Sequence, residues 1–232
     1  MTRLSPRARR ALRELRAKGS KRSIEGMARY GIRPKVAYGV PAPAVRALAR
    51  KLGRDHALAL EFRESGVFEA RALAALVEDP KALTSSEMER WVREFESWAD
   101  CDSTCLSLFW KAPFAFEKAR AWAKRGPEIQ RRAGFALMAA LAVHDKGAED
   151  RQFLRFLPLL EAAATDERNL VKKAVNWSIR QVGKRNGRLN REAVHAAHRI
   201  AKLPSPSARW IASDALRELE SPQVKARLKK RG

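Results

Sequence analysis

Residues 97–105, with the sequence SWADCDSTC, combine an aromatic ring and two carboxylates in a chain that is otherwise strongly basic. Trp98 and Asp102 are four residues apart, and the acidic stretch around them is a poor site for phosphate. A carboxylate on a surface suited to a polyanion is a candidate for chemistry. The alternative is structural, because Asp100 or Asp102 could cap a helix that begins near Ser103. The sequence leaves both interpretations open.

A second aromatic residue, Trp177, lies among cations and amides in a helix that the sequence predicts over residues 169–186. At about 100° per residue, the apolar side chains of this segment gather on one side, which must face the core. That side consists of Leu170, Val171, Ala174, Val175, Ser178 and Val182. The opposite side carries Lys173, Asn176, Trp177, Arg180 and Lys184. A large aromatic side chain there either packs against a neighbouring helix or faces a ligand.

The same pattern recurs in the helix predicted over residues 206–219. Its apolar stripe consists of Ala208, Ile211, Ala212, Ala215, Leu216 and Leu219. This leaves Trp210 on the other face with Ser213 and Arg217. Two aromatic residues on polar or basic faces favour a binding surface. Nucleic acid suits such a surface, because cations contact phosphates while the rings pack on sugars or bases or face a cationic lesion.

The charge of the chain indicates the same class of partner. Lys and Arg total 48 against 26 Asp and Glu, which gives a net charge of +22. Residues 168–191 contain basic side chains and no acid, and both ends of the chain are basic as well, either as DNA-contacting segments or as solvated helices. The cations that we expect on the nucleic-acid surface are Lys172, Lys173, Arg180, Lys184, Arg185, Arg209 and Arg217.

Several other classes of protein are excluded or disfavoured. Cys101 and Cys105 are too few for a disulfide scaffold, and with four histidines they form no recognised metal-binding pattern, so we expect no metal and no cofactor. No apolar run is long enough to span a membrane, and the basic start lacks the apolar stretch of a secretory signal. We therefore expect a cytoplasmic protein. Phosphate-binding glycine loops, nucleophile elbows and HExxH motifs do not occur in the sequence.

Helices alone are expected to position these residues. Ser, Thr, Asp or Pro begins each periodic segment and Gly or Pro ends it, and the alternating runs typical of strands are missing. The expected helices are 5–19, 23–31, 41–53, 55–65, 67–79, 85–96, 103–112, 114–125, 127–144, 149–165, 169–186, 190–203, 206–219 and 221–230. Short linkers make consecutive helices antiparallel neighbours. This predicts an all-α fold in which helix pairs stack as a solenoid rather than a globular bundle. We expect one domain over residues 1–232, with a basic helix at 1–20 and a basic end at 221–232.

Three segments resemble, in the same order, the bacterial DNA alkylation repair proteins built from HEAT-like repeats, the alkylpurine DNA glycosylases. They are SWADCD at 97–102, VKKAVNWSIRQVGKRN at 171–186 and ARWIASDALREL at 208–219, and the similarity extends from about Tyr30 to Leu228. The resemblance implies a right-handed solenoid whose basic concave surface holds duplex DNA. It also implies removal of 3-methyladenine and 7-methylguanine without a metal and without flipping the lesion into a deep pocket.

The resemblance further assigns roles to individual residues. Trp98 and Trp177 would face the lesion, and Asp102 would be the catalytic carboxylate. Arg132 would contact DNA, although the adjacent Arg131 fits the motif as well. One carboxylate can suffice, because an alkylated purine carries a full positive charge and leaves as a neutral base.

Three functions are therefore compared. The first is a monomeric glycosylase that acts on alkylated bases in duplex DNA and leaves an abasic site. The second is a non-catalytic HEAT-like module that binds damaged or branched DNA by shape and charge. The third is a solenoid that binds RNA or scaffolds proteins, which the net charge permits for RNA and disfavours for most protein partners.

Overall fold

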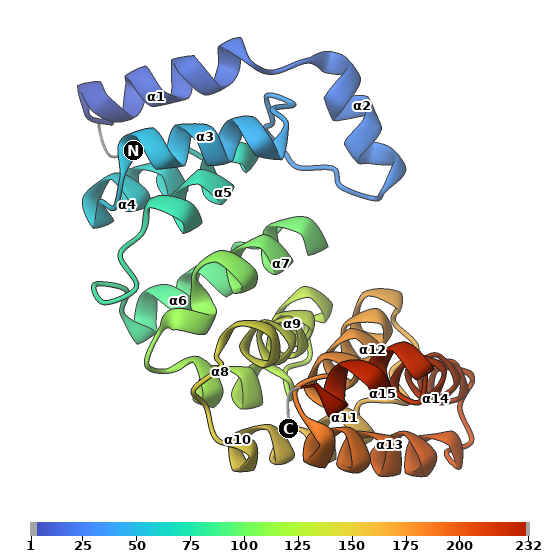
Figure 1. The fold of residues 1–232 in the computed structure, drawn as a ribbon. Helices are drawn as coiled ribbons and strands as arrows, with labels where there is room; N and C mark the ends of the chain where they lie inside the picture. Colours follow the sequence, from blue (N-terminus) through green and yellow to red (C-terminus); the bar gives the residue numbers. More distant parts are fainter. Residues whose placement is uncertain (1–3, 231–232) are drawn as a thin grey trace. The chain divides into compact units, whose positions relative to one another are not determined.

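The computed structural model describes residues 4–230 of the chain and contains only helices in that range (Figure 1). This confirms the all-α prediction. The backbone contacts divide the chain into two compact units, unit 1 at residues 1–112 and unit 2 at residues 113–232. The outermost parts of the two predicted basic ends, residues 1–3 and 231–232, lie outside the described residues. No helix in the described range is long and apolar enough to cross a membrane.

Unit 1 is organised around the central helix α5. Its elements are α1 (Pro6–Ala17), α2 (Lys21–Arg29), α3 (Ala42–Leu52), α4 (His56–Glu64), α5 (Phe68–Val77), α6 (Ser85–Arg93), α7 (Trp98–Ser107) and the 3₁₀ turn η1 (Phe109–Lys111). Helix α5 contacts α1, α3, α4 and α7. The side chains of Phe62, Leu73, Met88 and Trp91 are fully buried and form the core of this unit. Ser5, Ser20, Asp55 and Thr84 each cap a helix by accepting a hydrogen bond from its first turn; Ser20 caps α2, which therefore begins two residues before the Ser23 start that the sequence predicts.

The connection between α2 and α3 is fixed onto α5 by a buried carboxylate. Glu69 accepts hydrogen bonds from the backbone N–H groups of Tyr38, Gly39 and Val40 at 2.9, 2.7 and 3.1 Å. Gly39 has φ of 74°, and a Cβ atom there would lie 2.2 Å from the carbonyl oxygen of Ser20. Only glycine fits this turn, which brings the start of α3 against α5.

Unit 2 is built on two long helices, α9 and α12, which pack against each other. Its elements are α8 (Ala115–Trp122), α9 (Glu128–His144), α10 (Asp150–Leu154), α11 (Leu157–Ala162), α12 (Asn169–Gly183), α13 (Gly187–Ala201), α14 (Pro206–Leu219) and α15 (Pro222–Lys229). Helix α12 also contacts α13 and α14. A Cβ atom on Gly134 of α9 would lie 2.3 Å from the backbone nitrogen of Ala123, so the absence of a side chain at this position allows the start of α9 to approach the end of α8.

Two of the expected helices are wrong in detail. The helix expected at 103–112 begins five residues earlier, at Trp98, and is followed by the separate turn η1. The helix expected at 149–165 is divided into α10 and α11, because Pro158 has no N–H donor and stands in the first turn of a new helix. The remaining helices lie within a few residues of their predicted positions. The solenoid and its basic concave surface stay predictions.

Candidate functional site

Helix α7 carries the first group of predicted site residues, in unit 1. Ser97 is its N-cap, and the Ser97 hydroxyl accepts a hydrogen bond from the Asp100 backbone N–H at 3.3 Å. Neither Asp100 nor Asp102 caps a helix, so the capping interpretation is wrong. The helix starts early enough to place Trp98 and Asp102 one turn apart on the same face, and both side chains are half-buried. The Trp98 indole N–H donates to the carbonyl of Tyr30 at 3.0 Å, which ties this face to the end of α2.

Asp100 and Asp102 are separated by about 200° around α7, since each residue advances the helix by about 100°. Asp100 is only 2% exposed and faces two guanidinium groups. Its Oδ2 lies 3.5 Å from Nη1 of Arg71, and its Oδ1 lies 3.9 Å from Nη1 of Arg63. Burial raises the pKa of Asp100, although the two arginines act in the opposite direction. Asp100 therefore anchors α7 to the core, and Asp102 is the one of the two carboxylates that retains exposed surface.

The two arginines have further partners that complete this buried network. Arg63 pairs with Glu94 at 2.7 Å, and its guanidinium carbon lies 4.7 Å from the centroid of the Trp91 ring. Arg71 pairs with Glu96 at 3.0 Å. The network joins α4, α5, α7 and the segment between α6 and α7, so the position of Trp98 and Asp102 depends on it. Cys101 and Cys105 are buried on the same helix, as apolar packing predicts.

Helix α12 carries the second group, in unit 2. Its predicted apolar side is confirmed, since Val171, Ala174, Val175, Ser178 and Val182 are buried and Leu170 is half-buried. Trp177 is half-buried and Lys173 is exposed. Asn176 departs from the prediction, because it is buried and its amide donates to Oδ2 of Asp214 at 2.7 Å. Helix α14 covers this edge of α12, which a helical wheel of α12 alone cannot reveal.

The cations at the end of α12 are paired with acids from α14. Arg180 Nη1 lies 2.5 Å from Glu218 and 3.6 Å from Asp214, and Lys184 also pairs with Glu218. Burial alone would raise the pKa of Glu218, but Lys184 and Arg180 hold it below its usual value. The segment 168–191 has no acid in sequence, yet the fold partly neutralises two of the cations predicted to contact DNA.

An exposed aromatic and cationic cluster lies where α12 meets α14. Trp210 is 42% exposed, and the Lys172 ammonium lies 5.3 Å from the centroid of its ring. Lys173 and Arg209 are exposed. The predicted stripe of α14 is confirmed, except that Leu216 is half-buried. We call Lys172, Lys173, Arg209 and Trp210 the Trp210 cluster. Arg217 is also exposed, and it pairs with Asp214.

The other arginines predicted to contact DNA have structural partners. Arg132 is 6% exposed and donates to the carbonyl of Leu170 at 2.6 Å. Its neighbour Arg131 is 3.2 Å from Asp166. Arg185 donates to the carbonyls of Ala142 and Ala148 at 2.8 and 3.3 Å. These contacts join α9, α12 and the intervening loops, and they leave little of the Arg132 side chain exposed for a ligand.

Further cations that the sequence did not single out lie on α3 and just beyond its end. Arg46 and Arg50 are one turn apart on α3, Arg54 follows the C-cap Gly53, and all three are exposed. Helical spacing was visible in the sequence, but α3 contains no aromatic residue to draw attention to it. The structure thus groups Trp98 with Asp102 and the α3 arginines in unit 1, and Trp177 with the Trp210 cluster in unit 2.

Comparison with known proteins identifies the family. A family model described as DNA alkylation repair enzyme matches residues 11–219. One solved structure is similar to this chain with a TM-score of 0.76 and 20% sequence identity. The match covers 95% of each of the two chains. That structure belongs to a family described as new, related to the HEAT-like repeat DNA glycosylases and with affinity for branched DNA structures; at this identity the likeness concerns the fold. Curated proteins give no significant match. The chain belongs to the DNA alkylation repair enzyme family.

Proposed function

We propose that the protein is a DNA glycosylase that hydrolyses the N-glycosidic bond of cationic alkylated purines in duplex DNA and leaves an abasic site. Its substrates would be 3-methyladenine and 7-methylguanine. The observation that carries the proposal is the different environment of the two carboxylates of α7: Asp100 is buried against Arg63 and Arg71, while Asp102 keeps exposed surface beside Trp98. Membership of the DNA alkylation repair enzyme family supports the same reaction.

The chemistry requires one carboxylate. When the bond between C1′ and N9 of the alkylated purine breaks, both electrons go to the base, which already carries a positive charge and leaves neutral. Positive charge then develops on the deoxyribose, where the Asp102 carboxylate would stabilise it. A water molecule adds to C1′ and releases its proton to the surroundings. The ring face of Trp98, one turn from Asp102 on α7, would attract the cationic base.

The Trp210 cluster would supply part of the DNA-binding surface. Lys172, Lys173 and Arg209 would contact phosphates, and the exposed ring of Trp210 would pack on a sugar or base. Arg180 and Lys184 would contribute less than their sequence suggests, because each is already paired with Glu218. We expect the protein to act as a monomer and without a metal or other cofactor.

Base release from methylated duplex DNA tests this function. The experiment separates the products by chromatography and quantifies free 3-methyladenine and 7-methylguanine, with the same DNA incubated without protein as the control for spontaneous loss and heated DNA as the measure of total releasable base. Release of either base above the spontaneous rate supports the proposal. If the protein binds the same DNA tightly but base release stays at the spontaneous rate, the proposal is contradicted.

A second candidate is a non-catalytic module that binds branched DNA. It is favoured by the affinity of the structurally similar protein for branched DNA structures. Fluorescence anisotropy at one fixed salt concentration, with a four-way junction and a linear duplex of equal length, tests this alternative. A clear preference for the junction together with no base release would favour the second candidate over the first.

A further inference from the structure

Unit 1 contains a groove along α5 that the proposed reaction does not use. Its floor consists of Phe68, Ala72 and Leu76, which are spaced by four residues and are all half-exposed. Its walls are the start of α3 and one face of α7, and its volume is about 210 Å³. A second hollow of about 310 Å³, lined by Arg46, Ala49, Arg50, Gly53, Arg54 and Leu76, continues it along α3. We call the two together the α5 groove; they share Arg46 and Leu76.

The first part of the α5 groove is apolar with a small polar edge. Along α7 it is lined by Ala99, Ser103 and Ser107, and Asp100 lies at its side. Asp100 is 2% exposed, and its two carboxylate oxygens face Arg63 and Arg71. The other carboxylate at the groove, Glu69, already accepts three backbone hydrogen bonds. The groove therefore offers flat apolar surface together with the hydroxyls of Ser103 and Ser107, of which the Ser103 hydroxyl already donates to the carbonyl of Asp100 at 3.2 Å.

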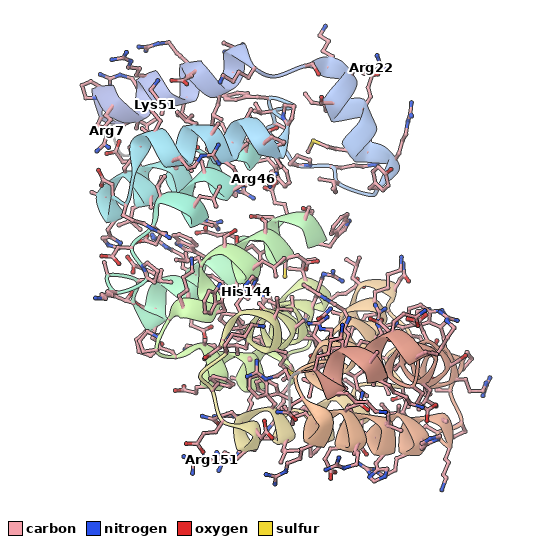
Figure 2. The ribbon with its side chains drawn as sticks, viewed as in Figure 1. Arg7, Arg22, Arg46, Lys51, His144 and Arg151 are labelled. Atoms are coloured by element: carbon pink, nitrogen blue, oxygen red, sulfur yellow. The ribbon has the colours of Figure 1, made fainter. Side chains whose placement is uncertain are left out.

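The second part of the α5 groove is cationic. Arg46, labelled on α3 in Figure 2, and Arg50 are exposed and form no hydrogen bond or ion pair with any described residue. Arg54 also lines this part and donates to the carbonyl of Glu78. No acid lines this hollow. A row of arginines with no counter-ion suits the phosphates of one nucleic-acid strand.

We propose that the α5 groove binds one unstacked nucleobase of the bound DNA, and that Arg46 and Arg50 hold the phosphates beside that nucleotide. The proposal rests on DNA binding as part of the proposed function, but not on base release. The volume of the apolar part is below the ~300 to 1,000 Å³ typical of pockets for drug-sized ligands, which fits a single heterocycle. Aromatic and aliphatic side chains bind the face of any base, while the hydroxyls of Ser103 and Ser107 can bind its polar edge.

The position of the groove relates it to the proposed reaction. Ser103 in its wall is the neighbour of Asp102, so a base bound there lies about 100° around α7 from the proposed catalytic carboxylate. A base that leaves the DNA stack to enter this groove would disrupt base stacking close to the glycosidic bond that is cleaved. Branched DNA also contains unstacked bases, so the groove would serve the second candidate function as well.

The test uses 2-aminopurine, whose fluorescence increases when it leaves the base stack. Two duplexes each contain one tetrahydrofuran analogue of an abasic site; in one the 2-aminopurine stands opposite the analogue, and in the other it stands beside it on the same strand. The full-length protein is compared with Ala72→Leu, which fills the floor of the groove with a good helix-forming residue. Ala57→Leu, at an exposed position of α4, is the matched control, and thermal melting checks that all three proteins fold.

We expect the wild type and Ala57→Leu to raise the 2-aminopurine fluorescence of one of the two duplexes. Ala72→Leu should abolish this increase. Its DNA affinity, measured by fluorescence anisotropy, should stay within a few-fold of wild type. If Ala72→Leu fails to fold, Arg46→Ala with Arg50→Ala takes its place, and this variant should lose the increase and lower the salt-dependence slope by about 0.7 to 0.9 per arginine. No increase with bound wild type, or an increase that survives Ala72→Leu, would overturn the proposal. Because no step requires base release, absence of glycosylase activity leaves this test intact.

Discussion

Replacing Asp100 by Asn should destabilise unit 1 far more than the same replacement of Asp102. Asp100 is 2% exposed, and its charge opposes the effect of burial, which lowers the pKa of Arg63. Removing one partner of a buried ion pair costs about 3 to 5 kcal/mol. Arg63 and Arg71 would keep Glu94 and Glu96, so we expect the lower end of that range, about 3 kcal/mol. Asp102 is half-buried, and we expect Asp102→Asn to cost below about 1 kcal/mol.

Urea unfolding, monitored by circular dichroism, gives the free energy of unfolding of both variants. A loss of about 3 kcal/mol corresponds to a decrease in Tm of roughly 6 to 12 °C for a chain of this size, which melting curves resolve easily. The reasoning would be refuted if Asp100→Asn cost less than about 1 kcal/mol, or if Asp102→Asn cost as much as Asp100→Asn. Either result would mean that Asp100 is not the structural carboxylate of α7, or that Asp102 is as important for stability as Asp100.

Three further predictions concern packing, pH and DNA binding. Gly134→Ala should destabilise unit 2 by about 1 to 3 kcal/mol or more, because its Cβ atom would lie 2.3 Å from the Ala123 nitrogen, whereas Gly126→Ala has open space and should be near neutral in the same melting experiment. The hydrogen bond to Glu78 raises the pKa of His56, so folding stabilises protonated His56, and this contribution is complete below the usual pKa of 6.5 and is lost as pH rises through the higher folded value. Unfolding free energies measured from pH 5.5 to 8.5 should therefore decrease less in His56→Gln than in the wild type. Lys173→Ala should reduce the salt-dependence slope of duplex binding by about 0.9, and Arg180→Ala should reduce it less because Arg180 is paired with Glu218; equal effects in anisotropy titrations would contradict that difference.

The sequence was sufficient for features that depend on periodicity within one helix. Positions along α12 and α14 that share an apolar side were predicted because a helix repeats every 3.6 residues, and Trp210 was found on the exposed face for the same reason. The start of α7 was missed because several candidate caps lie close together. Ser97 caps the helix, and Asp100, which favours a cap by residue type, is instead buried by Arg63 and Arg71.

Features that depend on contacts between helices could not be predicted from one sequence. Glu218 lies 34 residues beyond Lys184, and only the packing of α14 on α12 shows that it neutralises cations at the end of α12. The burial of Asn176 has the same origin, since its partner Asp214 belongs to α14. The α5 groove was missed because its floor and walls come from three helices, each of which has an ordinary pattern alone.

The most direct test of the proposed glycosylase compares base release and DNA affinity in the same preparations of wild type and Asp102→Asn. Both proteins are incubated with methylated duplex DNA at one salt concentration, and free 3-methyladenine and 7-methylguanine are measured beside the dissociation constant for that duplex. We predict that the wild type releases alkylated base, and that Asp102→Asn binds DNA within a few-fold of wild type but releases none above the spontaneous rate. Equal release by both proteins, or release by neither despite tight binding, would contradict the role of Asp102 as the catalytic carboxylate.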